Sequence, residues 1–305
     1  MSLSEIPERT QLYYNEEGYL SLMKKIITSG QEEKNDRTKV GTRYSFGETV
    51  IHELYGNKVC MMSSRKIGFK TVLEELLFFI RGDTDTNNLK SSIWKGNTTK
   101  QFIKNRGLDY NEGVMGPMYG WQWRHCGEKY TGPNEDYKGY DQFSKLLESL
   151  LHDPSGRRHI ISSWIPNDIE KGVLAPCHVL QQYQFQSFND QLYLDCLLFQ
   201  RSADLALAGM SFNALSYSIL LNMICAYLRQ NGVKVMPGKL VHNIGNAHVY
   251  SNHIENVKIQ VERNVYPYPT LELTGDFSDL TRVDQEQFTL NGYKSCEKLK
   301  YDMAV

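Results

Sequence analysis

The chain has 305 residues, of which 41% are hydrophobic and 23% charged, and its formal net charge at pH 7 is -1. This composition is typical of a soluble globular protein, and the balanced charge argues against a general affinity for nucleic acid or membrane surfaces. The N-terminal sequence MSLSEIPERTQLYY lacks the apolar core of a signal peptide, and the longest apolar runs are too short to cross a bilayer. We therefore expect a cytoplasmic protein.

The order of predicted elements favours one continuous domain. We find no internal repeat, low-complexity tract or linker rich in proline and serine, so we predict a single domain over residues 1–305. Residues 1–14 are expected to form a poorly ordered N-terminal segment. Apolar side chains at helical spacing predict a helix over residues 16–30. Residues 39–56 are expected to be a strand, and residues 70–82 a mostly buried helix because they are apolar nearly all round.

The second half of the chain alternates strands with further helices. Residues 140–156 have an amphipathic helical pattern, and residues 157–165 are predicted to be a strand. Residues 178–202 should form two strands around the turn residues FND. The apolar segment 212–232 predicts a long core helix, and residues 239–263 a strand, a turn and a last helix. The expected class is therefore α+β.

One cysteine stands at an unusual place. In LAPCHVLQQYQF, Cys177 follows Pro176, which favours an extended backbone, at the start of a predicted strand. A buried cysteine usually acts as a small hydrophobic residue and an exposed one can be a nucleophile, so this stretch alone leaves both interpretations open. The six cysteines are scattered and form no CxxC pair, which argues against zinc ribbons and redox dithiols. We expect reduced thiols and no metal site.

Acidic and basic residues supply further candidates. Glu74 and Glu75 lie inside the predicted buried helix; one can face solvent, and the other falls near the apolar side, where burial raises the pKa of a carboxyl group. Arginines occur in the strings NDRT, GRRH and FQRSAD, and each is either solvated surface or a bidentate phosphate ligand. Arg201 is the strongest candidate because it ends an apolar strand. The aromatic string GPMYGWQWRH can be core or a wall for a flat heterocycle.

Several of these strings occur together in one known family. In order along the chain they are NDRT, VLEELLFFI, GPMYGWQWRH, APCH, QRSAD, SFN, NAHVYSNH and the C-terminal YDMAV. Their order and approximate spacing resemble the folate-dependent thymidylate synthases, from about residue 15 to Val305. The resemblance implies a single α+β domain with a large twisted mixed β-sheet packed by helices. It also implies a homodimer that shares each active site across its interface.

The resemblance implies the substrates as well as the fold. They are a dUMP-type nucleotide and 5,10-methylenetetrahydrofolate, with no metal, no membrane and no obligatory nucleic acid partner. Cys177 matches the nucleophile that adds to C6 of the pyrimidine, and Glu75 matches the residue that manages proton transfers together with water. Tyr119 matches the position implicated in removing the C5 proton, and Asn213 matches the residue that reads the pyrimidine edge.

Further matched positions surround these four. Two extended strands, 177–185 and 192–201, would place Arg201 close to Cys177, where a guanidinium group favours the thiolate. The matched nucleotide-binding residues are Arg37, Arg157, Arg158, Gln200, Arg201, Ser202, Asp204, His178, His248 and Tyr250, with Arg157 and Arg158 reaching across the dimer. The matched folate-binding residues are Ile93, Trp94, Asn97, Asp204, Leu207, Phe212, Met303 and Val305.

The chain departs from the family pattern near the active site. Between Arg201 and Asn213 it is one residue longer than usual, and Ser211 stands where a proline is customary. Three single replacements also occur, at Ala175, Ile165 and Asn246. The longer loop lies between the expected pyrimidine and folate sites, so it can move the wall of the active site. The departures bear on substrate and product more than on the fold.

Three functions are compatible with the sequence. The first is reductive methylation of dUMP to dTMP with release of dihydrofolate. The second is 5-hydroxymethylation of dUMP or dCMP, in which water replaces the folate hydride. The third is a catalytically inactive protein that binds nucleotide or RNA, against which the set of Cys177, Glu75, Arg201 and Asn213 argues. An Asn amide matches N3–H and O4 of uracil, but a flipped amide would fit cytosine.

Overall fold

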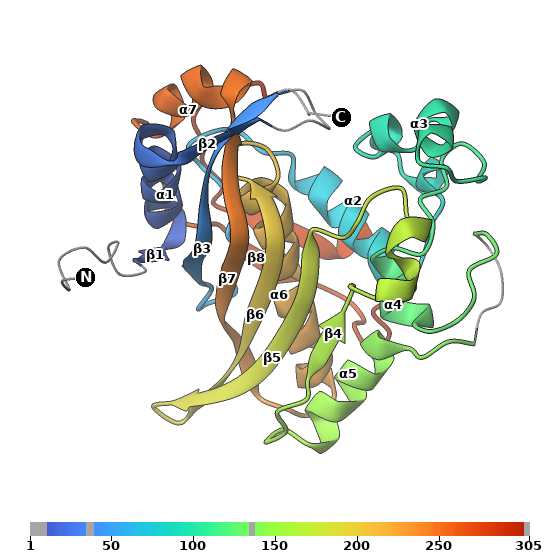
Figure 1. Cartoon of the computed structure of the whole chain (residues 1–305). Helices are drawn as coiled ribbons and strands as arrows, with labels where there is room; N and C mark the ends of the chain where they lie inside the picture. The colour runs from blue at the N-terminus through green and yellow to red at the C-terminus, as the bar shows by residue number, and fades with distance from the viewer. Residues whose placement is uncertain (1–10, 35–39, 134–137, 302–305) are drawn as a thin grey trace, which may run out of the picture.

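The computed structural model describes residues 11–34, 40–133 and 138–301. Most strands join one mixed, seven-stranded sheet with the order β1-β3-β7-β6-β5-β4, and β2 pairs with β3 beside this path (Figure 1). Its strands are β1 (Leu12–Tyr14), β2 (Gln31–Lys34), β3 (Gly41–Glu53), β4 (Ile160–Ser162), β5 (His178–Phe188), β6 (Gln191–Asp204) and β7 (Val235–Tyr250). The short strands β8 (Thr270–Leu273) and β9 (Phe288–Asn291) form a separate pair.

The α-helices lie behind the large sheet or beside it (Figure 1). They are α1 (Asn15–Ser29), α2 (Phe69–Ile80), α3 (Lys100–Asn105), α4 (Gly120–His125), α5 (Gln142–His152), α6 (Leu215–Gln230) and α7 (Ile254–Gln260). Helix α6 lies behind β6 and β7, whereas the near face of the long strands carries no helix (Figure 1). Along β6, Leu194, Cys196 and Leu198 are fully buried on the helix side, and Phe199 on the opposite side is 40% exposed. The sheet therefore has one core face and one uncovered face.

The central helix α6 is apolar because it is enclosed. Against the expectation that the apolar runs are too short, the run Gly209–Gln230 is long and apolar enough to cross a membrane, but 83% of its most apolar window is buried inside the protein. Its neighbours are the sheet, α2 and α5. Burial on all sides removes the need for a polar face, so the hydropathy of this segment is that of a core helix.

The structure confirms the α+β class and the predicted helices, and it corrects two details. Residues 1–14 were expected to be poorly ordered; residues 1–10 lie outside the described residues, whereas residues 12–14 form β1, which pairs in parallel with Thr49 to Ile51 of β3. Burial of the Tyr13 side chain accompanies this pairing. The strand predicted from residue 239 begins at Val235 and continues to Tyr250, and only residues 251–253 form the turn before α7.

Candidate active site

Cys177 lies at the N-terminal end of β5, and Arg201 lies beside it near the end of β6. The two strands are antiparallel neighbours, and the Arg201 backbone N–H donates to the Cys177 carbonyl oxygen at 2.9 Å. The Arg201 guanidinium donates to the carbonyl oxygens of Pro176 and Ala175, and its Nη2 lies 3.8 Å from Cys177 Sγ. The predicted approach of the two residues is confirmed. A guanidinium this close stabilises the thiolate form of a cysteine.

Tyr119 closes the other side of the cysteine. Its hydroxyl accepts a hydrogen bond from the Cys177 backbone N–H at 2.9 Å. The ring stacks on His178 with centroids 4.0 Å apart, and His178 Nδ1 in turn meets the Tyr217 hydroxyl at 2.9 Å. Burial raises the pKa of Tyr119 well above its usual value and lowers that of His178 to about 3. Both side chains are therefore neutral at pH 7, and His178 packs behind the tyrosine.

Glu75 is the buried acid of α2. It is 8% exposed, and burial raises the pKa of its carboxyl group to about 7, against a smaller lowering by the Trp94 hydrogen bond. That bond runs from Trp94 Nε1 to Glu75 Oε1 at 2.8 Å. The neighbouring Glu74 instead accepts from the backbone N–H groups of Lys90 and Ser91. The structure thus separates the two acids: Glu75 faces the core, and Glu74 holds a loop.

A buried chain of hydrogen bonds fixes the orientation of Asn213. Gln200 Nε2 donates to Asn213 Oδ1 at 2.9 Å and to the Ser202 carbonyl oxygen at 3.0 Å. His242 Nε2 lies 2.8 Å from Gln200 Oε1, which can only accept. The Ser202 carbonyl oxygen can only accept, so it fixes Nε2 of Gln200 on its side, and this Nε2 in turn requires the oxygen of the Asn213 amide. Neither amide can therefore flip without losing a hydrogen bond. Asn213 therefore presents its Nδ2 group and the remaining lone pair of Oδ1 to any ligand.

A second polar group follows at the end of β6. Asp204 pairs in register with His248 of β7, and the His248 ring meets the Tyr250 ring edge-on at 5.2 Å. His248 Nδ1 lies 3.0 Å from Asn246 Oδ1, so Asn246 accepts from an Nδ1–H tautomer. Burial lowers the pKa of His248, which leaves its Nε2 as a neutral acceptor. Asn246, one of the residues that differ from the family pattern, thus accepts a hydrogen bond from His248.

The predicted folate residues lie at several depths around this centre. Trp94, Leu207 and Phe212 are partly buried against the core, so each keeps some exposed apolar surface. Asn97 is buried, and Ile93 is half-buried. These faces can hold a flat heterocycle beside Glu75. Met303 and Val305 were also predicted here, and they lie outside the described residues.

The predicted phosphate ligands are not all in one place. Arg201 lies in the site, and Ser202 follows it on β6. Arg157 and Arg158 are exposed just ahead of β4, and no contact within residues 11–34, 40–133 and 138–301 joins them to Arg201. Arg37 lies outside the described residues. One chain therefore brings together the cysteine, the acid and the amide, but not the whole arginine set.

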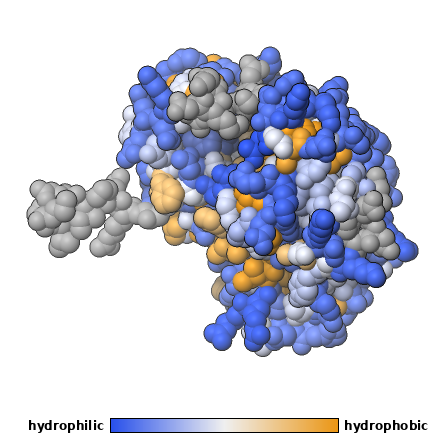
Figure 2. All heavy atoms as spheres, turned by 45° about the vertical axis from the view of Figure 1, so that its right-hand side comes forward, coloured by the Kyte–Doolittle hydropathy of each residue, from blue (hydrophilic) through white to orange (hydrophobic). Residues whose placement is uncertain are grey.

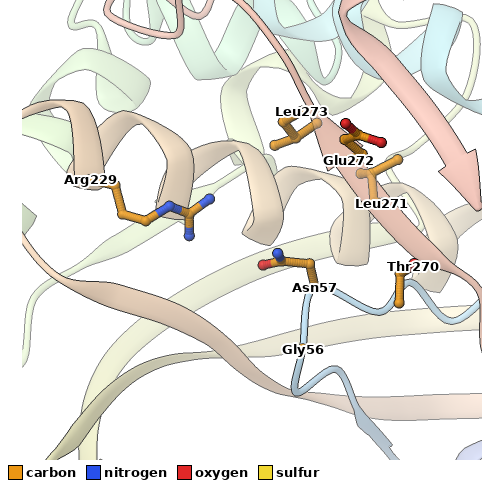
Figure 3. Close-up of a pocket in the computed structure, with 7 residues that line it drawn as sticks. All are labelled: Gly56, Asn57, Arg229, Thr270, Leu271, Glu272 and Leu273. Carbon is orange, nitrogen blue, oxygen red and sulfur yellow. The ribbon is translucent and has the colours of Figure 1, made fainter.

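One surface cavity lies away from the site. A cavity of about 340 Å³ is lined by Gly56, Asn57, Arg229 and residues 270–273, and it shares no residue with the site around Cys177 (Figure 3). Arg229 and Glu272 reach it from α6 and β8 (Figure 3). Within the described parts of the chain, no group of three His, Cys, Asp or Glu side chains is arranged to hold a metal ion.

Some site residues were not found from the sequence. Trp164 stacks on the Arg201 guanidinium at 5.7 Å, and His242 begins the hydrogen-bond chain to Asn213. Arg65 donates into the loop that precedes Asn213. A polar residue in an apolar strand was the available signal for His242, but its partner is 42 residues away in sequence. Contacts at that separation depend on strand pairing, which local patterns do not fix.

A thiol beside a guanidinium, a buried acid and an oriented amide at one end of a mixed sheet are groups that a cysteine-nucleophile active site uses. The sequence profile described as thymidylate synthase matches residues 17–305. The chain belongs to the thymidylate synthase family, which confirms the resemblance drawn from the sequence.

Individual relatives agree with this assignment. The chain is 37% identical over 300 residues to a thymidylate synthase from Ascaris suum, covering 95% of this chain and 97% of that protein. It is 37% identical over 296 residues to one from equine herpesvirus 2 (strain 86/87), covering 95% and 98%. A bifunctional dihydrofolate reductase-thymidylate synthase from Plasmodium chabaudi is 37% identical over 299 residues, or 96% of this chain. The chain spans 49% of that relative, and 57% and 62% of similar bifunctional proteins from Zea mays and Paramecium tetraurelia.

Proposed function

We propose that the protein transfers a one-carbon unit from 5,10-methylenetetrahydrofolate to C5 of dUMP and releases dTMP and dihydrofolate. The observation that carries this proposal is the contact between Arg201 Nη2 and Cys177 Sγ at 3.8 Å, beside the oriented amide of Asn213. Membership of the thymidylate synthase family and relatives of that name over nearly the whole chain support it. The fold positions these groups by pairing β5 with β6.

Each step of the proposed reaction uses a group whose position or protonation depends on its surroundings in the site. The Cys177 thiolate adds to C6 of the uracil ring, which places an electron pair on C5 and O4; C5 then attacks the methylene carbon of the folate. We assign removal of the C5 proton to Tyr119, whose hydroxyl lies 2.9 Å from the Cys177 nitrogen, with water as the final acceptor of that proton. Glu75, with a pKa of about 7, gives or takes protons at neutral pH. Loss of the C5 proton breaks the bond between the transferred methylene carbon and the folate nitrogen, so tetrahydrofolate leaves and an exocyclic methylene forms on C5. Tetrahydrofolate gives a hydride to that methylene and becomes dihydrofolate, and the electrons that return to the C5–C6 bond expel the Cys177 thiolate.

The proposed base is uracil. Uracil offers N3–H as a donor and O4 as an acceptor, which the Oδ1 and Nδ2 of Asn213 match together. Gln200 and His242 hold this amide in one orientation, so the site presents one pattern of donor and acceptor. A site with buried polar groups rejects a ligand that leaves them unpaired. Cytosine therefore fits less well unless the amide turns against its partners.

The proposed product is methyl rather than hydroxymethyl. The exocyclic methylene takes the folate hydride where water is excluded, and takes water otherwise. The extra residue before Asn213 raised the question of a loosened wall. Gly209, Met210 and Ser211 are all buried, so the loop is packed although it is longer. Trp94 adds a large apolar face at the side of Glu75.

The proposal includes a homodimer and a cytoplasmic location. The uncovered face of the sheet carries the exposed Phe199, and Figure 2 shows apolar patches on an otherwise hydrophilic surface. A second copy on this face would cover it and bring the partner's exposed pair of arginines to the incomplete phosphate site. All six cysteines are free thiols, which supports a reducing compartment.

Analysis of the reaction product tests this function directly. Purified protein is incubated with methylenetetrahydrofolate and either dUMP or dCMP, and the nucleotides are weighed by mass spectrometry while dihydrofolate is followed by its absorbance. We expect dTMP and dihydrofolate in equal amounts from dUMP. A 5-hydroxymethyl nucleotide without dihydrofolate would identify the hydroxymethylase instead. Binding of nucleotide without any product would identify the inactive homologue.

A mixture of two inactive variants should recover activity if arginines act across the dimer. Arg158→Ala supplies an intact Cys177, and Cys177→Ala supplies an intact Arg158. Each heterodimer then contains one complete site of two, so a randomly exchanged equal mixture should regain about a quarter of the wild-type rate. Turnover of dUMP after subunit exchange is the measurement.

The matched control is a mixture of Arg157→Ala with Arg158→Ala. Both residues belong to the same contributing pair, so every site in that mixture still lacks one arginine. No recovery is expected there. If the first mixture also stays inactive although mass spectrometry detects heterodimers, the shared site is wrong.

Replacing Asn213 by Asp should shift the preference towards dCMP. A carboxylate accepts a hydrogen bond from the exocyclic amine of cytosine, but it repels the acceptor oxygen O4 of uracil. Gln200 Nε2 can still donate to a carboxylate oxygen at this position, so that hydrogen bond is kept. We expect the ratio of kcat/KM for dUMP over dCMP to fall by about 100-fold or more. Competition between the two nucleotides in one reaction measures this ratio. An unchanged ratio would remove Asn213 as the discriminating residue.

A further inference from the structure

The residue added to the loop before Asn213 is absorbed by a wider helical turn. Residues Gly209–Ala214 form a π-helix, and the N–H groups of Phe212 and Asn213 both donate to the Ala208 carbonyl oxygen at 3.0 Å. A π-turn holds one residue more than an α-turn of the same span, and such turns are frequent at functional sites. The longer loop therefore enters α6 through a turn that holds one residue more than an α-turn.

A buried arginine ties this loop to the core. Arg65 is 7% exposed, and its Nη2 donates to the Ala206 carbonyl oxygen at 2.8 Å and to Ser211 Oγ at 2.7 Å, with a longer contact to the Leu207 carbonyl oxygen at 3.3 Å. Ser211 is itself fully buried. The serine that stands at the customary proline position is thus an acceptor for a buried cation. A charge-assisted hydrogen bond of this kind is stronger than a neutral one.

The segment that carries Arg65 is held firmly on its far side. The buried carboxylate of Glu16 accepts from the backbone N–H groups of Ser63 and Ser64 and from the Ser63 hydroxyl, at 2.6–2.9 Å. The Tyr301 ring packs 5.1 Å from the Arg65 guanidinium carbon. Arg65 therefore projects from a fixed backbone, and its position is not free to follow the loop.

The same loop leads directly into the site. Ser211 immediately precedes Phe212, a predicted wall of the folate cleft, and stands two residues before Asn213. Gln200 fixes which way the Asn213 amide points, but it makes only one bond to that side chain. The π-turn sets the position of the Asn213 backbone, and Arg65 holds the π-turn through its hydrogen bond to Ser211. Displacement of this turn would move the amide and the apolar wall together.

We propose that Arg65 and Ser211 form a positioning pair for the reaction, in which the buried hydrogen bond between them sets the place of Asn213 and Phe212. The pair acts through these two residues and has no contact with the reacting atoms. It deepens the proposed function and rests on it, because Asn213 and Phe212 matter through nucleotide and folate. The pair does here what a proline does elsewhere in the family pattern: it fixes the backbone before the amide.

Replacement of Ser211 by Ala tests the pair. We expect the dissociation constant for dUMP, measured by titration calorimetry, to rise about 10-fold, which corresponds to about 1.4 kcal/mol. The share of hydroxymethyl product should rise as well, because a displaced Phe212 admits water. Arg65→Lys keeps a donor for Ser211 and should retain more affinity than Arg65→Met. In the Arg65→Met background, Ser211→Ala should have no further effect on binding.

The matched control is Ser218→Ala. Ser218 is also fully buried near the start of α6. Its hydroxyl donates to the Leu215 carbonyl oxygen and accepts from the Cys60 backbone N–H, and it makes no hydrogen bond to Asn213 among those of the described residues. Both alanine variants should lose stability, but only Ser211→Ala should lose dUMP affinity. Equal affinities in wild type and Ser211→Ala would overturn the proposal. Weakened dUMP binding in Ser211→Ala supports the positioning pair. If the wild type forms no dTMP, the proposed reaction is rejected, but the binding result for the pair still stands.

Discussion

Replacing Cys177 by Ala is expected to lower the turnover of dUMP by at least about 10⁴-fold, as removal of a covalent nucleophile does in other enzymes. The thiol lies 3.8 Å from Arg201 Nη2, and we assign to it the bond to C6. The side chain is half-buried, so its loss should change the free energy of unfolding by no more than about 1 kcal/mol. Steady-state kinetics and urea unfolding are the two measurements.

The variant should still bind dUMP, because its arginines and Asn213 are intact. Cys296→Ser is the matched control: Cys296 is also half-buried, and its thiol makes a weak contact at 3.6 Å with the Asn264 carbonyl oxygen. It should keep near wild-type activity. A thiol reagent should label Cys177 first and be excluded by bound dUMP. More than a trace of turnover in Cys177→Ala would remove this residue as the nucleophile.

Local patterns predicted the helices well because their evidence is local. The spacing of apolar residues in α1, α2 and α5 repeats every three to four residues, and each helix ends close to its predicted boundary. The turn between β5 and β6 was equally clear from FND. The prediction for residues 12–14 was wrong because their order comes from pairing with β3, more than 30 residues away. Such pairing cannot be predicted from the three residues themselves.

The site was predictable only where the family pattern marks it. Cys177 and Arg201 follow from two strands in register, but periodicity did not decide which glutamate of α2 is buried. The interaction of Arg65 with Ser211 spans 146 residues and links two segments with ordinary local sequences. The sequence identified Ser211 as a departure without supplying its partner. Tertiary packing supplies such partners, and the structure is needed to find them.

Glu75→Gln is expected to make the protein more stable at pH 8 while lowering its activity. Burial raises the pKa of Glu75 from about 4.5 to about 7 in the folded state. A group with a raised folded pKa stabilises the fold fully below its unfolded pKa, and this contribution is lost as the pH rises through the folded pKa. Glutamine carries no charge and keeps an oxygen for Trp94 Nε1. At pH 8 the variant should therefore gain about 2–3 kcal/mol in the free energy of unfolding.

The gain should shrink towards zero near pH 4, where Glu75 is mostly protonated in both the folded and the unfolded protein. Urea unfolding at pH 4 and pH 8 measures both values. Glu74→Gln is the matched control on the same helix: its carboxylate accepts from two backbone N–H groups, so its replacement should bring no gain at pH 8. An equal gain in both variants, or one independent of pH, would contradict the burial of an ionised Glu75.

The activity of Glu75→Gln should fall by about 10²–10⁴-fold, the usual contribution of a positioned acid or base. Wild-type kcat/KM should change with pH around 7, and the residual activity of the variant should lack that inflection. Stability and activity then move in opposite directions at one residue. This is expected where an active site keeps a buried acid for its chemistry, because the fold would be more stable without the charge that the reaction requires.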